Sequence, residues 1–308
     1  MVSTQRTVAA MMLSCLPRFS LRDWDDDGND DDDDSLARRD TIWHDALESP
    51  SFDEEELACP LEKGFAEARP DKGWLLAHAS EPLEVSYRHE RGSGVHSLKV
   101  EAELDFPIDR VFAMGWEFEL FDAWNPFAID PTIVRRRESD DGDGDAMEMT
   151  VCCACWLPWP FSPRGLCVRI KTTDRLEDRG CYFQQIHDVE YENEAAATDG
   201  REKRERASVV KGSFVSFSPI RSATQDGSGS TKVLICGHFD PYMMAPPQWL
   251  VTFVLRLMTP VVFQHLVKAL KKAYSPSAES PSTHAKRVRT KSLYADMRDR
   301  VQEVVFAV

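Results

Sequence analysis

The stretch PPQWLVTFVLRLMTPVVFQHLVKALKKAY, residues 246–274, predicts one long helix. Two prolines stand where a helix can begin, and Lys268, Lys271 and Lys272 lie in the last turns, where cations suit the negative end of the helix dipole. Apolar residues recur every three or four positions, which indicates a covered helix face: Leu250, Val254, Leu257, Val261, and Leu266 or Leu270.

A membrane-spanning helix is the alternative interpretation of this stretch. At about 1.5 Å per residue it would be roughly 40 Å long, which is enough to cross a bilayer. Arg256 lies near its middle, however, and Pro260 and Lys268 follow, and such residues are costly in hydrocarbon. Because the preceding chain is rich in predicted strands, we expect a helix that closes over a sheet.

The composition is that of a globular, acidic protein. Of 308 residues, 42% are hydrophobic and 10% aromatic, which is sufficient for a substantial core. The formal net charge is −15, so we expect no nucleic-acid partner. The eight cysteines are scattered and no secretory leader is visible. We therefore expect reduced thiols in a cytoplasmic, monomeric protein.

Residues 1–50 are predicted to be a disordered acidic segment. The tract DWDDDGNDDDDDS (23–35) contains nine Asp, and high charge with low hydrophobicity is typical of disorder. Its spacing also fits a calcium-binding EF-hand loop from Asp23 to Asp34, although the twelfth position is Asp rather than Glu and no helix pair flanks it. Residues 1–22 contain three Arg and no acid, so an organelle-targeting segment is a second interpretation there.

A single domain is expected from residue 51 to residue 274. It opens with a capping box, Ser51 and Glu54, before a helix with an apolar face. A short helix is expected at 107–116. Apolar runs between polar turns predict nine strands: 73–79, 83–89, 96–104, 132–138, 147–156, 166–174, 181–189, 208–217 and 232–239.

The order of these elements predicts an α+β fold. Consecutive strands joined by short turns pair antiparallel, and the helices are segregated from them. A twisted sheet of nine strands curls. We therefore expect a curved antiparallel nine-stranded sheet, closed by the long C-terminal helix over an internal cavity.

Three local patterns, in this order, resemble the StAR-related lipid transfer (START) domain with its helix-grip fold. They are the proline-rich approach WLPWPFSPR (156–164), the late hairpin of 210–217 and 233–239, and the turn DPYMMAPPQWLV (240–251) into the last helix. The likeness covers about Ser51 to Tyr274. It implies an internal hydrophobic cavity that holds a lipid (a phospholipid, fatty acid or sterol) without catalysis.

Two departures from the START pattern concern the sixth strand. Gly165 follows Arg164 where the family has Asp, and Arg169 is one residue early, which turns a strand side chain to the other face. Residues 149–157 also lack the acid that pairs with arginine in sterol-binding members, so sterol is the less favoured ligand.

The resemblance implies a ligand site with an apolar lining and a few polar groups. A guanidinium suits phosphate or carboxylate, so Arg164 and Arg169 are the expected head-group ligands, with surface strand arginines as the alternative interpretation. The expected apolar lining, which an ordinary core would also explain, is Trp156, Phe183, Phe214, Phe217, Trp249, Phe253, Leu257, Val261 and Leu266.

No metal, cofactor or catalytic site is predicted. Cys152, Cys153 and Cys155 lack the paired spacing of a zinc site. In a strand, Cys152 would also point away from the other two. The sequence contains no nucleophile motif and no phosphate-binding glycine motif.

Residues 275–308 are expected to form a Ser/Pro linker, a basic patch and an amphipathic helix. The patch is Lys286, Arg287, Arg289 and Lys291. Such a tail can contact an anionic membrane transiently or dock on its own domain. The expected apolar face of the helix is Leu293, Met297, Val301, Val304 and Val305.

The sequence therefore favours binding and intracellular transfer or sensing of a lipid. Two alternatives stay open. One is a regulatory or scaffold protein whose cavity is filled by its own side chains. The other is an enzyme that acts on an apolar substrate in the cavity.

Overall fold

The computed structural model describes residues 74–89, 94–137, 146–189, 205–221, 229–242, 248–275 and 281–306. The targeting segment, the Asp23–Asp34 calcium loop and the capping-box helix that starts near Ser51 lie outside these ranges and stay predictions.

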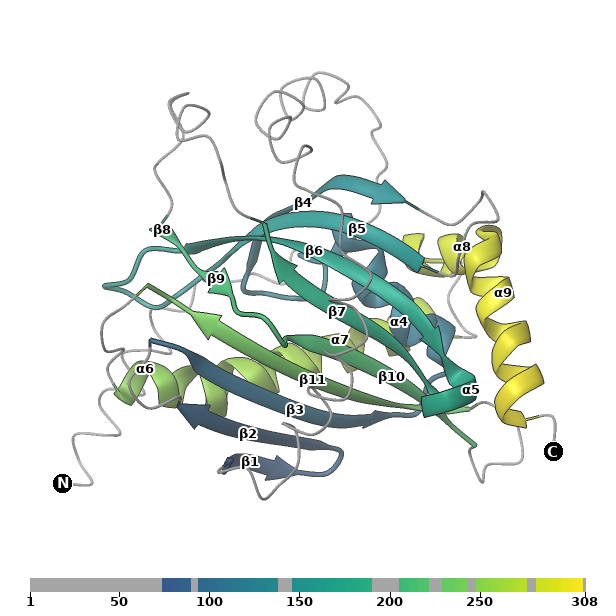
Figure 1. Cartoon of the computed structure of the whole chain (residues 1–308), viewed down its shortest axis with the longest axis horizontal. Helices are drawn as coiled ribbons and strands as arrows, with labels where there is room; N and C mark the ends of the chain where they lie inside the picture. Colours follow the sequence, from purple (N-terminus) through teal and green to yellow (C-terminus); the bar gives the residue numbers. More distant parts are fainter. Residues whose placement is uncertain are drawn as a thin grey trace.

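Nine strands form the antiparallel main path of one twisted sheet (Figure 1), which confirms the predicted α+β class and strand number; two further short strands pair with it. Their order is β1-β2-β3-β11-β10-β7-β6-β5-β4, so the edge strands β1 and β4 do not pair and the sheet is open. The bounds are β1 Leu75–Ser80, β2 Leu83–His89, β3 His96–Leu104, β4 Ala128–Arg137, β5 Ala146–Cys155, β6 Arg164–Arg175, β7 Cys181–Asp188, β10 Phe214–Ile220 and β11 Ser230–Asp240.

The single strand predicted at 208–217 is broken in two. A short strand β9 (Ser208–Val209) pairs with β11, and β10 begins only at Phe214. Between them Gly212 has a φ of 96°, a conformation that side chains disfavour and glycine permits. Another short strand, β8 (Glu205–Arg206), pairs in parallel with β6.

Each strand divides its side chains between two faces of the sheet. We call the face covered by helices the inner face and the opposite one the outer face. In β3 the inner residues are Leu98, Val100, Ala102 and Leu104, as the alternation predicted; Leu104 packs in the main core, and the other three pack with Leu255 of the long helix.

Helices gather at the inner face and at one end of the sheet (Figure 1). The predicted helix at 107–116 is confirmed as α4, and the basic patch of the tail is itself helical, as α8. The bounds are α4 Ile108–Trp116, η2 Phe118–Leu120, α5 Leu176–Arg179, α6 Gln248–Phe253, η4 Val254–Met258, α7 Thr259–Ala273, α8 Thr283–Thr290, α9 Ser292–Val301 and η5 Gln302–Phe306.

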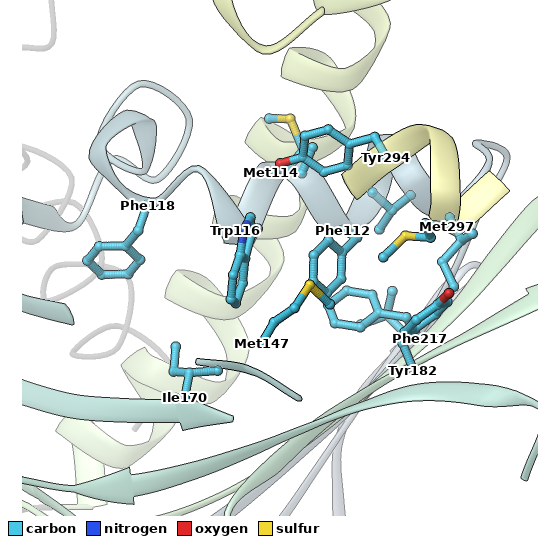
Figure 2. Packing of buried hydrophobic residues seen from close by; sticks show 14 of the residues in the cluster. Phe112, Met114, Trp116, Phe118, Met147, Ile170, Tyr182, Phe217, Tyr294 and Met297 are labelled. Atoms are coloured by element: carbon cyan, nitrogen blue, oxygen red, sulfur yellow. The ribbon is translucent and has the colours of Figure 1, made fainter. Parts of the chain in front are cut away.

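Helix α4 supplies the bulky centre of the core (Figure 2). Phe112 and Trp116 are both fully buried, with ring centroids 5.5 Å apart. The Phe112 ring also meets Phe217 of β10 edge-to-face at 5.4 Å. On its other side α4 contacts the tail, because Tyr294 and Met297 of α9 belong to the same buried cluster.

A buried carboxylate fastens the tail to α4. Glu117, at the end of α4, is inaccessible to solvent and accepts hydrogen bonds from Lys291 Nζ at 2.8 Å, Arg287 Nη1 at 2.6 Å and Tyr294 Oη at 2.5 Å. A second pair joins Arg298 to the buried Asp109 at 2.8 Å. The tail therefore docks on its own domain in this structure.

Helices α6, η4 and α7 follow one another without a break, and Pro260 explains the π-helical turn between them. Proline has no amide hydrogen to donate to the carbonyl of Arg256, so the regular ladder is interrupted. The hydroxyl of Thr259 donates to the carbonyl of Val254 at 2.9 Å instead. By length and hydropathy alone (a mean of 1.6), Leu250–Ala273 would also suit a membrane crossing.

The expectation that all cysteines are reduced thiols is wrong for one pair. Cys152 of β5 and Cys167 of β6 stand opposite each other in the antiparallel register, and their sulfur atoms are bonded. Because directly paired residues share a face, both project from the outer face. Cys152 does point away from Cys153, as predicted.

Replacing Glu117 with Gln should lower the free energy of unfolding by about 2–3 kcal/mol, because Arg287 and Lys291, each 28% exposed, lose their charged hydrogen-bond acceptor. Urea unfolding measures this. Glu119→Gln is the matched control, because the Glu119 side chain also contacts Arg287 but is 36% exposed. For this variant the free energy of unfolding should fall by less than about 1 kcal/mol. Equal losses for both variants would contradict the anchoring role of Glu117.

Stability should also depend on pH through this carboxylate. Burial raises the pKa of Glu117, but the hydrogen bonds from Lys291, Tyr294 and Arg287 outweigh it and hold the pKa at about 2, below the ordinary 4.5. A depressed pKa stabilises the folded state above about pH 4.5, and that stabilisation is lost as the pH falls from 4.5 towards 2. Unfolding free energies measured across this window should fall less steeply for Glu117→Gln than for the unmodified chain.

Candidate functional site

A cleft of about 570 Å³ opens between α7, the end of β3 and the turn that joins β1 to β2. Its volume lies within the range of about 300–1,000 Å³ that is usual for ligand pockets. The lining comes from α7, from the turn between β1 and β2, from the end of β3 and from the turn before α4: Pro82, Glu103, Leu104, Asp105, Phe106, Phe263, Gln264, Val267, Lys268 and Lys271.

The cleft has an apolar floor and a charged rim. Leu104 is buried, and Phe106, Phe263 and Val267 are half-buried against the main core. Exposed lysines stand on the α7 side of the rim, and exposed acids stand on the opposite side: Lys268 and Lys271 against Glu103 and Asp105. This arrangement suits an amphipathic molecule whose apolar part lies on the floor and whose polar part stays at the rim.

Four of the eleven predicted site residues meet in a second apolar zone, under the first half of the long helix. Trp156 follows β5, and its ring lies 6.4 Å from that of Phe253. Leu257 and Val261 pack against the same cluster, and Phe127 stacks on Trp156 at 5.9 Å. We call this zone the Trp156 cluster.

The two predicted head-group arginines lie on opposite faces of β6. Arg164 lies opposite Cys155 in the strand register. It is an even number of residues from Val168 and Ile170, so it shares their inner face. Its exposed fraction is 8%. Arg169 is on the outer face, where its Nε is 3.6 Å from Glu148. An odd separation in a strand reverses the side chain, so the two arginines do not face one space, and a head-group role for either stays a prediction.

The odd spacing along β10 also places two of the predicted phenylalanines on opposite faces of the sheet. Phe217 is on the inner face, but Phe214, three residues earlier, stacks with Phe183 at 5.1 Å on the outer face. Phe183 and Phe214 therefore do not line the space under the helix. Leu266 packs into the main core. Trp249 lies in α6, and its side chain is outside the described residues.

None of the predicted residues lines the cleft, and sequence reasoning missed it. The available signal was the width of the apolar stripe on the long helix, to which Phe263 contributes. What the sequence could not supply was the partner surface, because Leu104 and Phe106 lie some 160 positions away in the chain.

The titratable groups near the sheet form structural contacts. His238, Ser97 and Cys236 lie together, with His238 Nδ1 2.7 Å from Ser97 Oγ and Nε2 3.6 Å from Cys236 Sγ. All three are at most 4% exposed, so a substrate has no access to the thiol. Within the described ranges, no cluster of three His, Cys, Asp or Glu residues is placed to hold a metal ion.

The sequence matches no protein-family model and no curated protein, but solved structures match. Human StAR-related lipid transfer protein 5 aligns at 16% identity over 70% of this chain and 95% of its own, with a TM-score of 0.55. The chain has a START-like fold. Human STARD10 aligns at 15% identity over 81% of this chain and 89% of its own, with a TM-score of 0.56. The Zhui aromatase/cyclase from Streptomyces aligns at 8% identity over 60% of this chain and 99% of its own, with a TM-score of 0.36. At these identities the START likeness establishes the fold and not the ligand.

Proposed function

We propose that this START-like chain binds a lipid and transfers or senses it, without chemistry on the ligand. The observation that carries the proposal is the cleft beneath α7, which combines an apolar floor with opposite charges on the two sides of its rim. The name of human StAR-related lipid transfer protein 5, which has a similar fold, supports the ligand class.

The physical driving force is burial of the apolar part of the ligand. Each methylene removed from water contributes about 0.8 kcal/mol, so the contact with Phe263 and Val267 supplies most of the affinity. Lys268 and Lys271 favour an anionic group at the rim. The volume of about 570 Å³ favours a ligand with a single chain, such as a fatty acid. We further propose that the protein acts as an intracellular monomer.

Exchange of the ligand requires the long helix to move relative to the sheet. Its C-terminal end contacts α8, which Arg287 fastens to Glu117, so we place the movement at the other end of the long helix. The π-helical turn beside Pro260 is the proposed hinge, and the Trp156 cluster is the contact that opens.

A second candidate function is a regulatory or scaffold protein with a filled cavity. Phe112 and Trp116 of α4 favour it, because these rings occupy the centre of the inner face (Figure 2). The two candidates differ in whether the cleft takes up a ligand.

Val267→Trp should fill the cleft and reduce uptake of a fluorescent fatty acid from mixed liposomes by on the order of tenfold, since the buried chain loses several methylene contacts. His265→Trp is the control, because this exposed position on the same helix does not line the cleft. If Val267→Trp unfolds, Gln264→Trp tests the same wall from an exposed position. Uptake that is unchanged in the cleft variants would place the ligand elsewhere, and absence of uptake by the unmodified chain would favour the scaffold.

Pro260→Ala should restore the regular hydrogen-bond ladder, raise the free energy of unfolding by about 1 kcal/mol or more, and slow ligand transfer between liposomes. Thermal unfolding and a transfer assay measure the two effects on one sample. A gain in stability with an unchanged transfer rate would show that the turn is a fixed kink and not a hinge.

A further inference from the structure

The long helix and α8 carry an unbalanced positive charge. From Gln248 to Ser275 and from Pro281 to Lys291 there are eight Lys and Arg and no Asp or Glu, in a chain whose net charge is −15. Helices α7 and α8 are in contact. Their exposed cations form what we call the basic surface: Lys268, Lys271, Lys272, Lys286 and Arg289.

Two neighbouring cations bind an acid inside the fold, whereas the cations of the basic surface are exposed to solvent. Arg287 and Lys291 bind the buried Glu117. By contrast, within the described part of the chain no carboxylate forms an ion pair with Lys268, Lys271, Lys286 or Arg289. Like charges held this close repel one another, so an anionic partner would relieve the repulsion.

We propose that the basic surface is the docking site of the chain's own acidic tract, Asp23–Asp34. The tract carries nine Asp in twelve residues, and it is the strongest concentration of negative charge in the sequence. A single exposed ion pair is weak, so the docking depends on several cations acting together. The docking is independent of the proposed lipid function.

The length of the chain allows this contact. The 39 residues from Ser35 to Gly73 connect the tract to the start of the sheet, and they span at most about 130 Å when extended. As a flexible coil they would span roughly 35 Å, and the helix predicted to begin near Ser51, at about 1.5 Å per residue, would still leave a reach of tens of ångströms. A tether of matching span gives an effective concentration in the millimolar range, which favours the tract over a separate anionic partner.

Docking would place the tract beside the mouth of the cleft. Lys268 and Lys271 belong both to the basic surface and to the cleft, while Glu103 and Asp105 on the far rim would repel the tract and confine it to the helix side.

Zero-length carbodiimide cross-linking of the full chain, followed by peptide mass spectrometry, tests the docking directly because it joins a carboxylate only to an amine in contact with it. We expect residues 23–34 to form intramolecular cross-links to Lys268, Lys271 and Lys286. The yield of these cross-links should be on the order of five times the yield of cross-links to the exposed control residues Lys211 and Lys232. Raising the salt from about 50 mM to about 500 mM shortens the screening length from about 14 Å to about 4 Å, and the preference should then disappear. Equal yields to all exposed lysines, or cross-links only between two molecules, would overturn the proposal.

A second measurement separates the acidic tract from a membrane as the partner of the basic surface. In a variant with all nine Asp of the tract changed to Asn, vesicles of phosphatidylserine and phosphatidylcholine should bind on the order of fivefold more tightly than to the unmodified chain, because the lysines are uncovered. Lys268→Glu combined with Lys271→Glu in that variant should remove the gain. Equal vesicle binding with and without the nine Asp would contradict the docking and favour a surface that is always open to membranes.

Discussion

The architecture depends on the buried carboxylate of Glu117. It lies at the end of α4, with no exposure to solvent, and it binds Arg287, Lys291 and Tyr294 of the tail. A charge in this position is stable only with its partners present, so α4 and the tail hold each other in place. Because α4 also carries Phe112 and Trp116 into the core, the same contact supports the packing of the inner face.

This anchoring divides the long helix into two parts with different roles. Its C-terminal end packs against α8 and forms one wall of the cleft through Phe263 and Val267. Its first half rests on the Trp156 cluster, beyond the π-helical turn next to Pro260. A helix fixed at one end and interrupted in the middle can uncover the sheet without unfolding the core, which is the physical requirement for a binding site closed by a helix.

Local patterns predicted much of this fold, and long-range contacts explain what they missed. The alternation in β3 and the period of the long helix each depend on neighbours in sequence, so both could be identified in advance. The odd spacing from Phe214 to Phe217, and from Arg164 to Arg169, is also visible in the sequence. It would have placed the two members of each pair on opposite faces of the sheet. Local patterns do not contain the register of the strands or the way in which distant elements cross. Three features depend on these: the cleft, the pairing of Cys152 with Cys167, and the hydrogen bond from Arg287 to a carboxylate 170 positions away.

The function proposed here depends on whether the space beneath α7 holds a lipid. Native mass spectrometry of the purified full chain, followed by organic extraction and identification of the extract, tests this most directly. We expect a bound mass that matches a single-chain lipid and disappears on extraction. A chain that has only its own mass, and that takes up nothing from mixed liposomes, would contradict the proposal and favour a scaffold with a filled core.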